Sequence, residues 1–141
     1  MTGQQPEMQL SWLDDLLSTS DAQWKIVVGH HPIYTAGPRT ENYDTLAVRK
    51  VLEPLLEKHK IPLYLSGHEH SLQHLRAEGK TTHQFISGSG SETTSVKSEI
   101  PYSRFQASSY GFMYFSFRKD DFWVHCVDHE GQIVYSTSIT M

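Results

Sequence analysis

Apolar residues recur at helical spacing near the start of the chain and then form an unbroken run. Leucines at this spacing predict a first helix over residues 7–18. Residues 26–28 are all β-branched, so we expect residues 24–28 to form a strand that is buried on both faces. Residues 29–43 hold prolines and glycines without any periodicity and predict a long loop, a feature that often has a function.

A second stripe at helical spacing follows, made of Val48, Val51, Leu52, Leu55 and Leu56. It predicts a helix over residues 44–59 that packs on a sheet, with Asp44 as its cap. Pro54 should kink this helix or tighten its last turn. Residues 62–66 are mostly apolar and predict a second buried strand.

The sequence pattern of the second half of the chain predicts strands and turns. The predicted strands are residues 72–76, 84–88, 110–117, 122–128 and 133–139. Residues 89–109 are rich in serine and threonine and predict a long loop. Both alternating faces of residues 110–117 carry aromatic side chains, with Phe112 and Tyr114 on one face. A sheet that is apolar on both sides leaves one face exposed, so we expect self-association through that face or a cover from a missing half of the protein.

The strand, helix and strand over residues 24–66 predict a right-handed crossover with two parallel strands. In such a unit the loops that follow both strands lie at the same edge of the sheet, where ligands bind in open α/β folds. This topology brings His30 close to His68 and His70.

Two of these loops begin in the same way, with a glycine and a histidine directly after an apolar run. The first reads Gly29-His30-His31-Pro32 and the second Gly67-His68-Glu69-His70. Neutral imidazoles suit zinc and iron, and Gly67 lets the chain turn sharply and approach a ligand closely. A single pair of this kind can equally be two solvated loop residues or a cap on a core hydrogen bond.

Composition narrows the class of protein. The chain has 141 residues and a formal net charge of −4, which fits one globular domain. It has no basic run, so neither nucleic acid nor an anionic membrane is an expected partner. No apolar run approaches the ~20 residues that span a bilayer. The single cysteine, Cys126, lies in a strand pattern, and we expect it to be buried and structural.

The two histidine motifs, in this order, resemble the last two metal-binding motifs of the calcineurin-like metallophosphoesterases, and most closely those of the purple or tartrate-resistant acid phosphatase group. The resemblance implies a four-layer α/β/β/α sandwich with a mixed sheet and helices on one face. It also implies a metal-dependent phosphoester hydrolase of the acid phosphatase type, in which two metal ions clamp a phosphate monoester and a bound hydroxide attacks phosphorus. A secreted or exocytoplasmic location is suggested by the resemblance only, and the residues leave it unknown.

The resemblance also assigns roles to single residues. His30, His68 and His70 match the three histidine ligands of the dinuclear centre, where iron is paired with iron, zinc or manganese. His31 and His74 flank them as candidates for a proton donor or for residues that orient the ligands. Arg39 and Tyr43 are candidates for contacts with substrate.

The carboxylate and amide ligands of this family come from Asp-x-x, Gly-Asp-x-x-Asp and Gly-Asn-His motifs. The sequence contains neither Gly-Asp-x-x-Asp nor Gly-Asn-His, and Asp14 and Asp15 lie on a predicted helix in the wrong surroundings. Without a bridging carboxylate, three imidazoles bind two dications weakly, because no group neutralises the charge or joins the two metals. We therefore expect residues 1–141 to be the C-terminal half of a phosphoesterase domain whose N-terminal half is absent, and to be inactive alone.

Two other interpretations remain open. The chain can be a non-catalytic metal-binding or scaffold module that keeps the histidines for structural reasons. It can also be another metallohydrolase or a cupin that uses the His-x-His pair. However, the metallo-β-lactamase pattern continues with Asp-His, whereas Ser71-Leu72 follows here, and the predicted helix over residues 44–59 argues against an all-β cupin.

Overall fold

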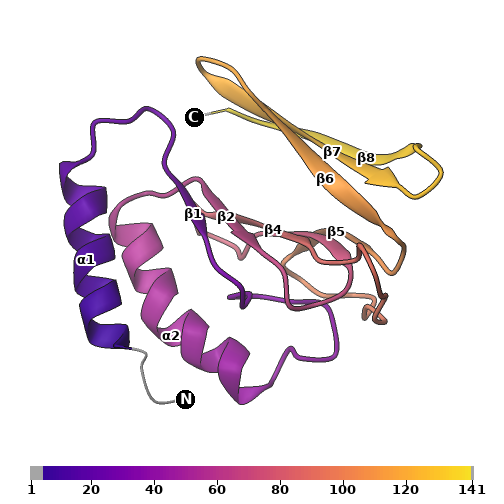
Figure 1. Ribbon diagram of the computed structural model, residues 1–141, viewed down its shortest axis with the longest axis horizontal. Helices are drawn as coiled ribbons and strands as arrows, with labels where there is room; N and C mark the ends of the chain where they lie inside the picture. Colours follow the sequence, from indigo (N-terminus) through magenta and orange to yellow (C-terminus); the bar gives the residue numbers. More distant parts are fainter. Residues whose placement is uncertain (1–4, 141) are drawn as a thin grey trace.

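The fold has three layers. A computed structural model describes residues 5–140, which form two helices, a five-stranded mixed sheet and a three-stranded antiparallel sheet. The helices lie against one face of the five-stranded sheet, and the three-stranded sheet lies against the other face (Figure 1). The predicted α/β class with a mixed sheet and helices on one face is confirmed.

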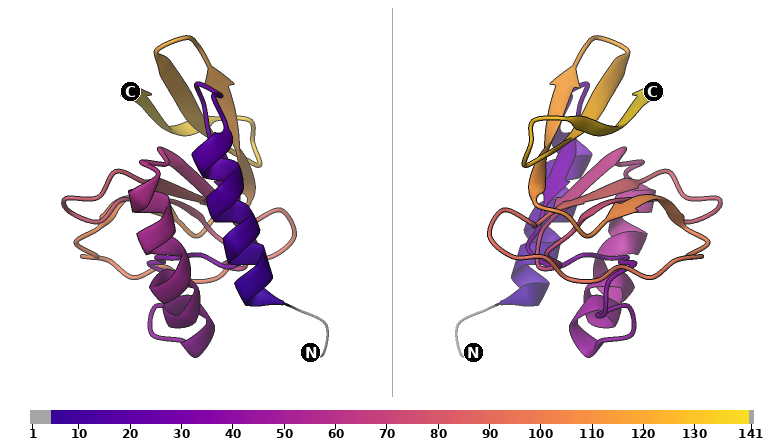
Figure 2. Two further views of the ribbon diagram at one scale, coloured as in Figure 1. Left: turned by 90° about the vertical axis from the view of Figure 1, so that its left-hand side faces the viewer. Right: turned by 90° about the vertical axis from the view of Figure 1, so that its right-hand side faces the viewer.

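The two helices lie side by side over the sheet (Figure 2). Helix α1 spans Pro6–Thr19 and helix α2 spans Tyr43–Lys58. Asp14 of α1 joins them, because its carboxylate lies 2.7 Å from Lys58 Nζ and 2.5 Å from His59 Nε2. Neither helix is both long and apolar enough to cross a membrane.

Asp44 was expected to cap α2, but the cap position is Asn42 and Asp44 lies in the first turn. An acidic side chain there still stabilises the helix, because the first turn is the positive end of the helix dipole. Pro54 is accommodated within the helix.

The five-stranded sheet has the order β1-β2-β4-β3-β5. Its strands are β1 (Ile26–Val28), β2 (Leu63–Ser66), β3 (Leu72–Leu75), β4 (His83–Ser87) and β5 (Ser103–Ala107). Strands β1, β2 and β4 are parallel, and β3 runs antiparallel between β4 and β5. The expected crossover is confirmed, because α2 connects the parallel neighbours β1 and β2.

Two expectations about this sheet are wrong. Strand β5 lies within residues 89–109, which were predicted to be a loop throughout. Its sequence is mostly polar, and it becomes a strand by pairing with β3 at the edge of the sheet. Strand β1 is not buried on both faces: only Val27 is buried, and Val28 is 72% exposed, because β1 is the other outermost strand.

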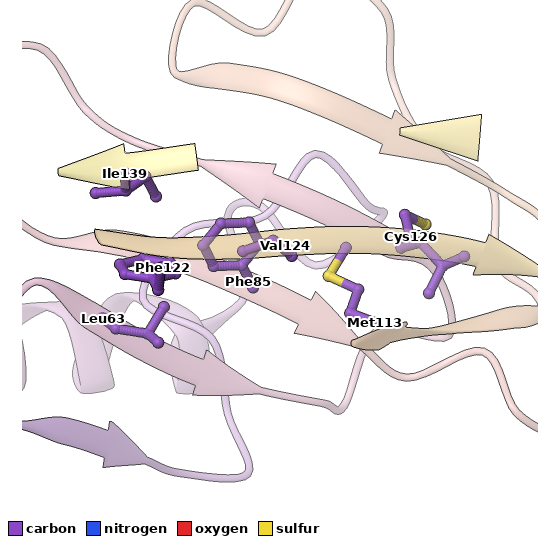
Figure 3. Packing of buried hydrophobic residues seen from close by; sticks show 8 residues of the cluster. Leu63, Phe85, Met113, Phe122, Val124, Cys126 and Ile139 are labelled. Atoms are coloured by element: carbon purple, nitrogen blue, oxygen red, sulfur yellow. The ribbon is translucent and has the colours of Figure 1, made fainter. Parts of the chain in front are cut away.

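The main hydrophobic core lies between the two sheets. The three-stranded sheet consists of β6 (Gly111–Phe117), β7 (Asp121–Asp128) and β8 (Ile133–Thr140). Its inner face places Met113, Phe122 and Cys126 opposite Leu63 and Phe85 of the other sheet (Figure 3). Cys126 is fully buried in this core, and burial raises the pKa of its thiol to about 11.

A polar chain of hydrogen bonds crosses this core. His74 on β3 shares one 2.8 Å hydrogen bond with the Tyr135 hydroxyl and another with His83, and its ring stacks on Phe85. Burial is the main cause that lowers the pKa of His74 to about 3. His74 is therefore a neutral, satisfied core residue.

The burial of His74 predicts a stability that declines in acid. The unfolded chain binds a proton to His74 near pH 6.5 and the folded chain does not, so unfolding becomes easier as the pH falls from 6.5 toward 3. We expect this group to contribute a slope of up to about 1.4 kcal/mol per pH unit. Urea unfolding between pH 7 and 4.5 measures it. The slope should be smaller in a His74→Phe variant, and an equal slope in both proteins would contradict the assignment.

The outer face of the three-stranded sheet bears exposed aromatic side chains. Phe112 and Tyr114 on β6 are 54% and 55% exposed, whereas Met113 between them is buried. The predicted division of β6 into two faces is thus confirmed.

We predict that the chain self-associates through the outer face, and that Phe112→Ser with Tyr114→Ser shifts it toward a monomer in sedimentation velocity. A wild-type chain that stays monomeric at high concentration would argue against this.

Candidate metal centre

Backbone pairing between β1 and β2 brings His30 and His68 to the same place. Val28 pairs with Leu65, and the ladder continues beyond the strands through two bonds, from Gly29 N–H to Leu65 O (3.0 Å) and from Gly67 N–H to His30 O (3.2 Å). His30 and His68 therefore leave the sheet at the same edge, and His30 Nε2 lies 3.1 Å from His68 Nδ1.

His31 completes a group of three imidazoles. Its ring centroid lies 4.3 Å from that of His68 and 4.9 Å from that of His30. One nitrogen from each of the three rings lies within 4.8 Å of the others, close enough to share one metal ion. The sequence placed His31 only beside the ligands.

A carboxylate from α2 faces this group. Asp44 Oδ2 lies 3.2 Å from His68 Nε2 and 3.7 Å from His31 Nε2. Burial alone would raise the pKa of Asp44, but the Thr45 amide and the two imidazoles bring that pKa below its ordinary value. Sequence reasoning missed this role, because the helical pattern alone explained the residue as a cap.

The backbone around His68 is turned sharply. His68 has φ 67°, and Glu69 N–H donates to Gly67 O at 2.8 Å, which closes a tight three-residue turn centred on His68. We expected Gly67 to make this turn, but the left-handed residue is His68. Such a conformation costs about 1–3 kcal/mol and persists only where surrounding contacts enforce it.

Those contacts come from a buried ion pair. The fully buried carboxylate of Glu69 accepts hydrogen bonds from Arg39 N–H at 3.0 Å and from Arg39 Nη1 at 3.1 Å. Gly37 leaves room for it, since a Cβ there would lie 2.6 Å from the carboxylate. The pair ties the loop after β1 to the turn at His68.

Buried amide side chains anchor the rest of the loop after β1. Gln84 Oε1 accepts from the N–H groups of Ile33 and Tyr34, and Gln73 Oε1 accepts from Ala36 N–H, all at 2.7–2.9 Å. Because these glutamines lie on β4 and β3, the sheet itself fixes the loop. The long loop is therefore ordered on the sheet.

Four predicted site residues lie outside the group of three imidazoles. His70 Nδ1 is 3.0 Å from Glu92 Oε2 and does not join the group. His74 does not flank the ligands as expected, because its position on β3 puts it in the core. Arg39 is bound to Glu69, and Tyr43 at the start of α2 is 88% exposed.

The imidazole group fits a single transition-metal ion. His68 Nε2 is buried and has no hydrogen-bond partner in the described part of the chain, although Asp44 is within ion-pair distance. An unsatisfied buried nitrogen is costly, and a metal ion would satisfy it. Desolvation, His31 and Arg39 lower the pKa of His68, which favours the neutral form that binds metals.

Three imidazoles that could hold a metal ion thus lie at the strand ends of a mixed α/β sheet. The profile of the calcineurin-like phosphoesterase family matches residues 2–72, and the chain belongs to that family. Purple acid phosphatase 7 of Arabidopsis thaliana is 46% identical over 57% of the chain and 23% of the relative. Tartrate-resistant acid phosphatase type 5 of Rattus norvegicus is 30% identical over 96% of the chain and 46% of the relative.

The fold has a close match among solved structures. GAP50, described as the anchor in the inner membrane complex of Plasmodium, has a TM-score of 0.85 and 24% identity over 96% of the chain and 42% of that protein. The chain thus spans about a quarter to a half of the length of these relatives.

We predict that Arg39→Gln destabilises the protein, because it leaves the buried Glu69 carboxylate with fewer partners. Hydrogen bonds to charged groups are worth about 1.5–3 kcal/mol, so the free energy of unfolding should fall by about that amount. Urea unfolding measures it, with Arg104→Gln, at an exposed position on β5, as the matched control. Equal losses in the two variants would show that the ion pair does not stabilise the fold.

Proposed function

We propose that this chain supplies the histidine ligands of a metallophosphoesterase centre that hydrolyses phosphate monoesters. The observation that supports this most directly is the approach of His30, His31 and His68 at the end of two parallel strands. Membership of the calcineurin-like phosphoesterase family, whose relatives include acid phosphatases, supports the reaction class. Metal ions in such sites neutralise phosphate charge and lower the pKa of bound water.

His30 and His68 are the proposed central ligands, and the third ligand is either His31 or His70. The geometry favours His31, which already lies beside the other two rings. The sequence motif favours His70, whose only ion-pair partner within residues 5–140 is Glu92. That carboxylate is 73% exposed, and an exposed pair contributes little, so the His70 ring can turn toward a metal.

The remaining candidates take different roles in this proposal. If His70 binds the metal, His31 is the proton donor or the residue that orients it, and Asp44 supports His31 across 3.7 Å. Arg39 acts by positioning, because Glu69 holds its guanidinium. Tyr43 is free to contact a substrate, since its side chain is largely exposed at the start of α2.

The described residues offer too few ligands for two metal ions. Only one cluster in residues 5–140 has a metal-binding composition, and Asp44 is the single carboxylate within 4 Å of its imidazoles. We propose that residues 1–141 form the C-terminal half of the domain and that carboxylates from an N-terminal half complete a dinuclear centre. Iron with iron, zinc or manganese, and a secreted location, are proposed from the resemblance alone.

A second candidate is a non-catalytic module that binds one metal ion or serves as a scaffold. The set of three imidazoles with one carboxylate favours it, because these groups can complete the shell of one ion without any further chain. This candidate predicts metal binding without hydrolysis even after a partner half is supplied.

Metal analysis tests the proposed site. We expect zinc to bind the chain. In a variant that combines His30→Ala with His68→Ala, the affinity for zinc should fall by at least about 10-fold. His125→Ala, on the outer face of the three-stranded sheet, is the control and should bind as the wild type does. Unchanged zinc affinity in the double variant would remove the site. Single His31→Ala and His70→Ala variants decide which ring is the third ligand.

A further inference from the structure

A cavity lies at the end of the five-stranded sheet that is opposite to the histidine cluster. Its volume is about 540 Å³, and it opens between the amino end of β4 and the last residues of β8. Because β4 runs parallel to β2, its first residue, His83, and the His68 turn lie at opposite ends of the strands.

The cavity has a cationic lining. Lys60, Arg76 and His83 line it together with Thr81, Ser138 and Thr140, and none of the lining residues is acidic. Within residues 5–140, neither Lys60 nor Arg76 makes an ion pair, and the only side-chain hydrogen bond of Arg76 runs from Nε to Lys80 O at 2.9 Å. The other N–H donors of the Arg76 guanidinium therefore remain available to a ligand.

The acidic groups nearby are already engaged. The Glu57 carboxylate accepts hydrogen bonds from the N–H groups of Thr81 and Thr82, and Glu53 pairs with Lys80 at 3.6 Å. Burial lowers the pKa of the His83 ring to about 4, and the positive charges of Arg76 and Arg104 add to this effect. A neutral imidazole at pH 7 can still present one N–H to the cavity.

We propose that this cavity binds a tetrahedral oxyanion, a phosphate or the phosphoryl group of an ester, at a site separate from the histidine cluster. Arg76 supplies paired donors and Lys60 a point charge. His74 Nδ1 shares a hydrogen bond with the Tyr135 hydroxyl, and His74 Nε2 shares one with His83 Nδ1. Nε2 is therefore the ring nitrogen of His83 that remains to contact the anion.

Phosphate titration of the full chain tests the proposal. After metal removal by a chelator, at constant ionic strength and pH 7, inorganic phosphate should produce saturable amide shifts at Thr81, His83, Ser138 and Thr140. Long-range nitrogen spectra should show His83 protonated at Nε2. Methyl phosphate in a parallel titration separates a site for free phosphate from a site for an esterified phosphoryl group.

Arg76→Gln should weaken phosphate binding by at least about tenfold. Arg118→Gln, at the turn between β6 and β7, is the matched control and should leave it unchanged. Lys60→Gln provides a second variant should Arg76→Gln disturb the amide spectrum. The proposal is overturned if neither phosphate nor methyl phosphate gives saturable shifts, if the shifts fall only around His30 and His68, or if the variants bind as the wild type does.

Discussion

The parallel pairing of β1 with β2 is the constraint on which the candidate metal centre depends. The ladder continues past both strands through Gly29 and Gly67, so His30 and His68 emerge one strand apart at the same edge. Side chains alternate between the faces of a strand, so a slip of one residue would separate the two rings. Helix α2 connects the two strands and packs on one face of the sheet beside them.

Buried polar groups then hold the loops in place. Glu69, Gln73 and Gln84 are fully or almost fully buried, and each accepts hydrogen bonds from the loop that follows β1. Their satisfied bonds offset the unfavourable backbone conformation of His68. The sheet beneath the site thus fixes the loops that carry the histidines.

The proposal that a further part of the domain completes this chain concerns both the fold and the site. The chain forms three layers of a four-layer α/β/β/α sandwich, and the outer face of β6 and the edge strand β1 remain exposed. Likewise, the three imidazoles and one carboxylate are the ligands that we propose this chain supplies to a dinuclear centre. The length of the relatives fits both observations, since each extends well beyond the region that matches.

The sequence alone determined the features that depend on local pattern. The stripe of α2 predicted a helix that packs on a sheet, and the alternation of β6 predicted its two faces. The glycine and histidine after each strand predicted the meeting of His30 with His68. Tertiary structure decided which other groups join them. His31 and Asp44 face His68, and His74 turns into the core, because packing between elements distant in sequence sets these positions. Strand β5 likewise forms by pairing with β3, because its own residues lack the hydrophobic pattern that predicts a strand.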